Sequence, residues 1–180
     1  MQVIMKKDQT LWFSMWFLAS IVTFGAAFFL MFYRLVEGRN NHFRREAGLE
    51  QKIVNFLKKQ GKEPPSTLGS FNKMNAKAWA ASIILFFPVF ALVYLLSRDL
   101  HIHEKRQDEF LTDVFPEKMF MPQTIPIRKY VLITIVTLGV GMVYWLYKIV
   151  NMYNAHFKAH WKFEKEILRL LEEKAIDKSM

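Results

Sequence analysis

One sequence pattern occurs twice in this chain, with the two copies 114 residues apart. Residues 18–25 read LASIVTFG and residues 132–139 read LITIVTLG, and the match continues without a gap for about forty residues. Residues 40–44 and 154–158 keep an asparagine, a histidine and a phenylalanine in the same register. A match of this length indicates one structural unit used twice, an apolar helix that continues into an amphipathic helix.

The repeat divides the chain into three parts. Residues 1–61 hold the first copy, and residues 128–180 hold the second copy. Residues 62–127 hold a linker, a further apolar stretch and a loop that contains prolines. Pro88 lies within that apolar stretch, where we expect it to kink a helix, because its ring removes one backbone hydrogen bond.

Three runs of the chain contain no charged residue, namely residues 11–33, 78–97 and 130–147. They are 23, 20 and 18 residues long, and a helix needs about 20 apolar residues to cross the hydrocarbon core of a bilayer. Hydrophobic residues make up 52% of the chain, and their clustering is more typical of membrane spans than of core helices. We therefore predict an all-α integral membrane protein with three transmembrane helices.

The segments that follow the first and third runs, residues 34–60 and 148–173, have apolar residues at helical spacing. We expect them to extend these two spans as long amphipathic helices. Residues 34–77 carry ten Lys and Arg and the tail from residue 148 carries seven, against eight on the other side of the predicted membrane. The excess of positive charge predicts a multi-pass protein of the cell membrane with its N-terminus outside and its C-terminus and both extensions in the cytoplasm.

The composition excludes several kinds of chemistry. The chain has no cysteine, so it forms no disulfide, thiolate metal site or cysteine nucleophile. Its net charge of +9 is explained more simply by anionic lipid than by nucleic acid. No serine elbow, phosphate loop or dinucleotide fingerprint occurs, and we expect the protein not to be an enzyme.

The histidines are the most informative polar residues. At about 100° per residue, His42 and Glu46 lie on the apolar stripe of the first extension, and His156 and His160 lie on that of the second. If the extensions pack together, the four side chains converge, and two i, i+4 pairs on facing helices have the spacing of metal ligands. We expect a structural polar layer that fixes the register. A transition-metal site for zinc, copper or iron and a pH-sensitive switch are the alternatives.

A weaker echo of the repeat appears at an offset of 61 residues, where His103 takes the place of His42 and Tyr94 that of Tyr33. It is either a degenerate third copy or chance. The predicted topology places His101 and His103 on the opposite side of the membrane from the other histidines. We therefore expect them to form an exposed pair outside the cluster.

The C-terminal copy also resembles a known family. Its residues 135–139 (IVTLG), 144–148 (YWLYK) and 154–161 (NAHFKAHW) are similar to a family of small uncharacterised prokaryotic membrane proteins. That family has a Thr-x-Gly…Tyr-Trp-x-Tyr-Lys span followed by an Asn-x-His-Phe helix. The resemblance implies a membrane fold and no established activity.

Long apolar faces without reactive groups favour a binding function. We expect a non-catalytic accessory or scaffold subunit whose partners are a bilayer with anionic lipids and other membrane subunits or copies of itself. A metal- or pH-responsive membrane sensor built on the His/Glu layer is the first alternative. An oligomeric channel is the second.

Overall fold

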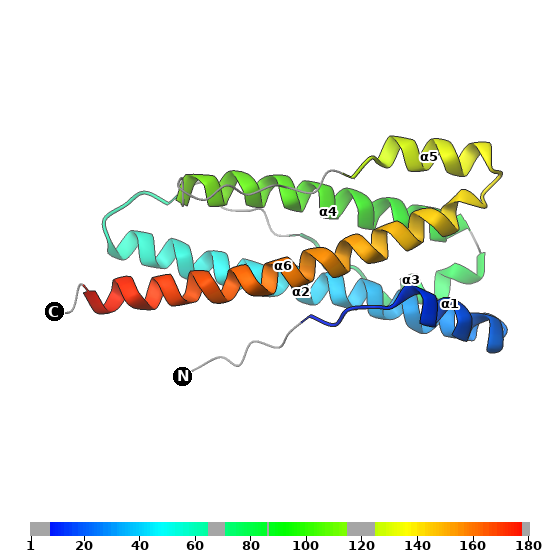
Figure 1. Cartoon of the computed structure of the whole chain (residues 1–180), viewed down its shortest axis with the longest axis horizontal. Coiled ribbons are helices and arrows are strands. Elements are labelled where there is room, and N and C mark those ends of the chain that lie inside the picture. Colours follow the sequence, from blue (N-terminus) through cyan, green and yellow to red (C-terminus); the bar gives the residue numbers. More distant parts are fainter. Residues whose placement is uncertain (1–7, 65–70, 86, 115–124, 178–180) are drawn as a thin grey trace.

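The computed structural model describes residues 8–64, 71–85, 87–114 and 125–177, with side chains up to residue 171. All elements in this part of the chain are helical, as predicted. In chain order they are α1 (Phe13–Val22), α2 (Ala26–Lys59), α3 (Ala76–Ser82), the 3-10 turn η1 (Ile83–Leu85), α4 (Phe87–Val114), α5 (Ile127–Val136) and α6 (Gly141–Asp177). The three long helices α2, α4 and α6 run along the length of the molecule, and the short helices lie towards one end (Figure 1).

Each long helix follows a shorter helical segment. α1 and α5 have the same bounds when one is shifted by the 114 residues of the repeat. α4 begins 61 residues after α2, and α3 with η1 precedes it as α1 precedes α2. The weak echo in the sequence therefore corresponds to a third copy of the same helical unit.

A threonine makes the break in two of the units. The Thr23 hydroxyl donates a hydrogen bond to the carbonyl oxygen four residues earlier (2.7 Å) and accepts one from the amide four residues later (3.0 Å). Thr137 makes the same two bonds at 2.7 Å each. In each unit the hydroxyl thereby gives a partner to an amide in the first turn of the next helix, where no preceding helical carbonyl can reach it.

Two residues with positive φ follow each threonine. Gly25 and Gly139 have φ of 90° and 97°, and Phe24 and Leu138 before them have φ of 49° and 50°. A right-handed helix cannot continue through such residues, and glycine adopts them at the least cost. The chain therefore turns at both places instead of extending one straight helix.

These breaks overturn the predicted membrane topology. The runs 11–33 and 130–147 are each divided at the Thr-x-Gly turn, and the run 78–97 contains the end of α3, the 3-10 turn η1 and the start of α4. Within the described residues, no helix combines the length and the apolar character that crossing a bilayer requires. The prediction of three transmembrane helices was wrong, and so was the multi-pass location with an outer N-terminus and a cytoplasmic C-terminus. Continuous apolar sequence does not reveal a turn whose signal is one Thr and one Gly.

Pro88 was also misplaced in a span. It lies in the first turn of α4, which begins at Phe87. Amides in the first turn of a helix have no helical acceptor, so the missing amide hydrogen of proline costs no hydrogen bond there. It therefore starts a helix and does not kink one. Residues 115–124 of the predicted proline-containing loop lie outside the described residues.

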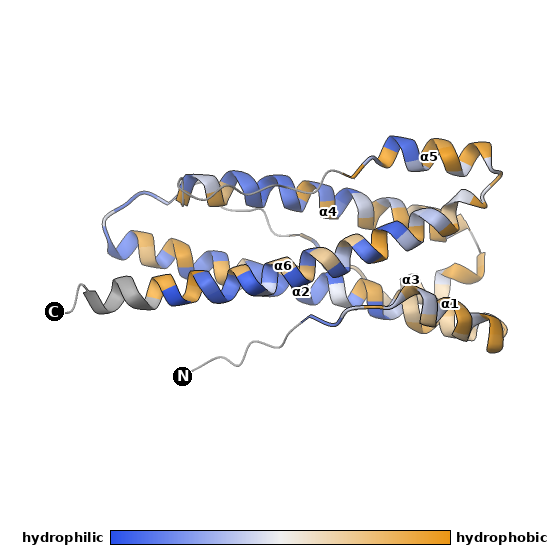
Figure 2. Cartoon of the chain, viewed as in Figure 1, coloured by the Kyte–Doolittle hydropathy of each residue, from blue (hydrophilic) through white to orange (hydrophobic). Residues whose placement is uncertain are grey.

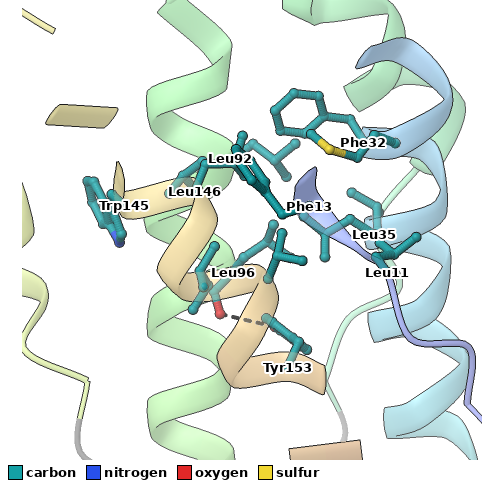
Figure 3. Packing of buried hydrophobic residues seen from close by; sticks show 14 of the residues in the cluster. Leu11, Phe13, Phe32, Leu35, Leu92, Leu96, Trp145, Leu146 and Tyr153 are labelled. Carbon is teal, nitrogen blue, oxygen red and sulfur yellow. Dashed lines mark hydrogen bonds between the residues drawn. The ribbon is translucent and has the colours of Figure 1, made fainter. Parts of the chain in front are cut away.

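Two apolar clusters hold the long helices together. The larger cluster packs the first halves of α2, α4 and α6 against α1 and α5, with Leu35, Leu96 and Tyr153 among its buried members (Figure 3). Within it, the Tyr153 hydroxyl donates to the backbone oxygen of Leu96 at 3.0 Å. The smaller cluster joins the second halves of the same helices, around Ile53 and Ile167. Along each helix, a stretch of buried polar residues separates the two clusters.

Candidate metal centre

The polar stretch between the clusters receives one pair of residues from each long helix. The two members of each pair are four residues apart, so both point to the same side of their helix. An offset of 61 residues carries the first pair onto the second, and an offset of 114 residues carries the first pair onto the third. The pairs are His42 and Glu46 on α2, His103 and Gln107 on α4, and His156 and His160 on α6.

The four imidazoles converge on one point. One ring nitrogen from each of His42, His103, His156 and His160 lies within 4.8 Å of the others. All four side chains are buried, with 0–6% of their surface exposed. The Nε2 atoms of His42 and His156 are 2.8 Å apart. The cluster is thus a buried set of ring nitrogens that can act as metal ligands.

Glu46 lies at the centre of this set. Its Oε2 is 2.7 Å from His103 Nε2 and 3.5 Å from His42 Nε2, and its Oε1 is 2.9 Å from His160 Nε2. Glu46 Oε2 and His103 Nε2 are both buried, and neither makes a hydrogen bond despite their approach. The carboxylate therefore faces the same point as the imidazoles.

Carboxylates behind two of the rings fix their orientation. Asp8 Oδ2 lies 2.8 Å from His42 Nδ1, and Glu104 Oε1 lies 2.6 Å from His156 Nδ1. A carboxylate accepts hydrogen bonds, so in both rings Nδ1 carries the proton and donates it. The Nε2 atom of each ring then presents a lone pair to the centre. In protein metal sites, histidine ligands often donate the N–H of their other ring nitrogen to a carboxylate in the same way.

Further polar residues complete the surroundings. The Gln107 amide donates to Glu46 Oε1 at 2.7 Å and also contacts His160 Nε2. Arg45 joins Asp8, at 2.6 Å, to Glu164, at 3.0 Å. These contacts tie the N-terminal segment, α2, α4 and α6 into one network around the cluster.

Burial and charge set the protonation of the cluster. Burial lowers the pKa of His42 to about 3 and also lowers the pKa of His156. Burial would raise the pKa of Glu46, but the surrounding histidines outweigh it and hold this pKa well below its usual value. Burial would likewise lower the pKa of His160, but the Glu46 carboxylate outweighs it and raises this pKa. At neutral pH, His42 and His156 are therefore neutral and Glu46 is ionised.

The structure brings together the four residues that the sequence places on the apolar stripes, namely His42, Glu46, His156 and His160. Whether a metal occupies them stays a prediction. The exclusion of His103 was wrong, because it depended on the membrane topology that the helix breaks overturn. The echo at 61 residues was the signal that could have included it. His101 is exposed and lies outside the cluster, as expected.

Asp8, Glu104 and Gln107 were not predicted. Gln107 could have been found from the echo, because it takes the place of Glu46 at the same offset. Asp8 and Glu104 have no counterpart in the repeat, so only the packing of the chain reveals them. Comparison with known proteins adds nothing to these assignments: no family model, curated protein or solved structure matches this chain. The resemblance to the membrane-protein family stays an expectation.

Proposed function

We propose that this protein binds one divalent transition-metal ion through His42, Glu46, His103, His156 and His160. The observation that carries the proposal is the close approach of His42 Nε2 and His156 Nε2 at 2.8 Å, with both Nδ1 atoms directed to carboxylates. Two nitrogens bound to one ion at about 2.0–2.1 Å and at right angles to one another are about 2.9 Å apart. The observed separation fits that arrangement.

A structural polar layer explains this geometry less well. In such a layer each donor faces an acceptor, because a buried polar group without a partner is costly. Here two lone pairs face each other, since the partners of His42 and His156 place both protons on Nδ1. A cation between the two Nε2 atoms turns this repulsion into two favourable bonds.

The charges around the cluster also suit a cation. The carboxylates of Asp8, Glu46, Glu104 and Glu164 lie in or next to it. Arg45 bridges two of them and offsets part of their charge. Glu46 itself is buried and ionised, and a buried carboxylate is unfavourable unless a positive charge lies next to it. A divalent ion would compensate it.

The donor set selects the class of metal. Imidazole nitrogen with one carboxylate oxygen suits zinc, copper and iron, and the absence of cysteine excludes thiolate coordination. The ligands come from α2, α4 and α6, so an ion would hold the three long helices together between their two apolar clusters. A metal centre of this kind supports the metal-responsive alternative more than the scaffold function. The scaffold function and the absence of catalysis both stay predictions. The channel alternative loses its basis with the three spans.

Metal content and thermal unfolding test the proposal. We expect the purified protein to bind zinc, copper or iron at close to one ion per chain, and the bound metal to raise Tm. His156→Ala should abolish both effects. His101→Ala is the matched control, because His101 is an exposed histidine on α4 two residues from a proposed ligand, and it should leave both unchanged. Equal metal binding by the wild type and by His156→Ala would overturn the proposal.

A further inference from the structure

The end of the molecule opposite the C-terminus exposes a large amount of apolar surface. Figure 2 shows hydrophobic residues gathered at this end, whereas hydrophobic and hydrophilic residues alternate along the remainder of the long helices. Its most exposed large side chains are Val22, Phe24, Ile84, Leu85, Phe87, Ile135, Val136, Leu138 and Val140. Apolar patches of this kind on a folded protein mark an interaction surface. We call this set the apolar end.

The apolar end is built from two helix breaks together with η1 and the first turn of α4. The breaks between α1 and α2 and between α5 and α6 lie at the same end of the long helices as η1 and the start of α4 (Figure 1). Phe24 and Leu138 occupy the tips of two breaks, with 101% and 95% of their surface exposed. Both have positive φ, a conformation in which bulky residues are rare. Burial within the chain does not account for large apolar side chains at these positions.

A belt of basic and aromatic residues borders the apolar end. The Arg34 guanidinium lies 5.2 Å from the centre of the Trp16 ring, and Lys148 Nζ lies 5.5 Å from the centre of the Tyr144 ring. Lys77, Arg128 and Lys129 are exposed at the start of α3 and of α5. The apolar runs between these cations contain no charged residue. Aromatic rings and basic side chains next to an apolar surface are typical of the boundary between lipid headgroups and acyl chains.

We propose that the apolar end inserts into one leaflet of a membrane that contains anionic lipids. The helix breaks would enter the acyl region, and the basic belt would contact the headgroups. Insertion of this kind requires no helix that crosses the bilayer, so it agrees with the short lengths of α1 and α5. The proposal does not depend on the metal centre, which lies farther along α2, α4 and α6.

The charge of the belt favours lipid over a second copy of the chain. Two copies that met through their apolar ends would bring two sets of like charges together, which is unfavourable. The net charge of +9 adds to this repulsion. An anionic surface complements the same belt, and its fluid acyl chains can surround side chains that protrude singly, as Phe24 and Leu138 do.

Vesicle binding by the full chain tests the proposal. We expect it to co-sediment with vesicles of phosphatidylcholine and phosphatidylglycerol, and more weakly with phosphatidylcholine alone. The double variant Phe24→Asn/Leu138→Asn should bind about tenfold or more weakly, because two apolar side chains are lost from the tips. Asparagine tolerates positive φ, so this variant should fold, and circular dichroism checks that it does. Arg128→Glu/Lys129→Glu should reduce the preference for phosphatidylglycerol.

Labelled cysteines show which part of the protein enters the lipid. Because the chain has no cysteine, Phe24→Cys, Leu138→Cys and Lys59→Cys each accept one environment-sensitive fluorophore. Vesicles should shift the emission of the labels at residues 24 and 138 to the blue and leave the label at residue 59, at the far end of α2, unchanged. No vesicle binding, an equal shift at all three positions, or a dimer that the asparagine variant dissociates while vesicles have no effect would overturn the proposal.

Discussion

His42 and His156 occupy equivalent positions in two copies of one sequence pattern, and their Nε2 atoms meet 2.8 Å apart between α2 and α6. The repeat therefore places like side chains opposite one another. Each ring is held from behind by a carboxylate, but the two carboxylates come from different places, Asp8 before α1 and Glu104 on α4. The inner residues follow the repeat, and the outer residues do not.

Loss of an outer carboxylate should weaken metal binding without removing a ligand. Glu104→Ala takes away the acceptor for His156 Nδ1, so the ring is free to rotate and its Nε2 becomes less basic. We expect the affinity for zinc to fall about 10- to 100-fold, measured by competition with a chelator. Glu109→Ala is the control, because Glu109 is exposed on the same helix. The same affinity in both variants would contradict the role of Glu104.

The contact between Asn154 and the chain before α1 should hold Asp8 at the site. The Asn154 side chain accepts from Leu11 N at 2.9 Å and donates to Leu11 O at 2.6 Å. Asn154→Ala should destabilise this segment by about 1–3 kcal/mol and speed amide hydrogen exchange in residues 8–12. Asn151→Ala, at an exposed position one turn earlier on α6, should have no such effect. Unchanged exchange in both variants would show that other contacts hold the segment.

A buried ion pair beside the site should contribute strongly to folding. Arg39 Nη2 and Asp99 Oδ2 are 2.6 Å apart, and both side chains are buried. Asp99→Ala leaves the guanidinium buried without its partner, and we expect a loss of about 3–5 kcal/mol in the free energy of unfolding. Arg98 contacts the same carboxylate at 3.1 Å but is 48% exposed, so Arg98→Ala should cost at most about 1 kcal/mol. Denaturant unfolding measures both, and equal losses would contradict the assignment.

Two glycine-to-alanine substitutions should have opposite effects. Gly139 has φ of 97°, a conformation that residues with a Cβ rarely adopt, so Gly139→Ala should destabilise the protein by about 1–2 kcal/mol. Gly48 lies inside α2 with open space around its Cα, so Gly48→Ala should stabilise it by about 0.5–1 kcal/mol. The midpoint of thermal unfolding gives both signs. A gain in Tm for Gly139→Ala would contradict the cost assigned to a Cβ at this φ.

The sequence predicts the helices and the stripe that carries His42, Glu46, His156 and His160, because periodicity determines which side chains share a helix face. It does not predict the breaks at Thr23 and Thr137, because a threonine within an apolar run is also compatible with a continuous helix. Periodicity also omits Asp8, whose place depends on how the chain before α1 crosses α6. His103 was excluded from the predicted cluster because the topology was inferred from charge counts. The weak echo at 61 residues had indicated that it belonged there.

Glu46, Gln107 and His160 stand at one and the same place in the three copies, yet they are an acid, an amide and an imidazole. The same helical unit positions this side chain in all three copies. The chemical character of the centre therefore depends on which residue stands at each position and not on the fold. Exchanging the side chain at one of these places would change the charge and the number of donors while leaving the helices as they are. Repetition of one simple unit, a short helix followed by a long helix, thus supplies a scaffold in which the metal-ligand residues can change one at a time.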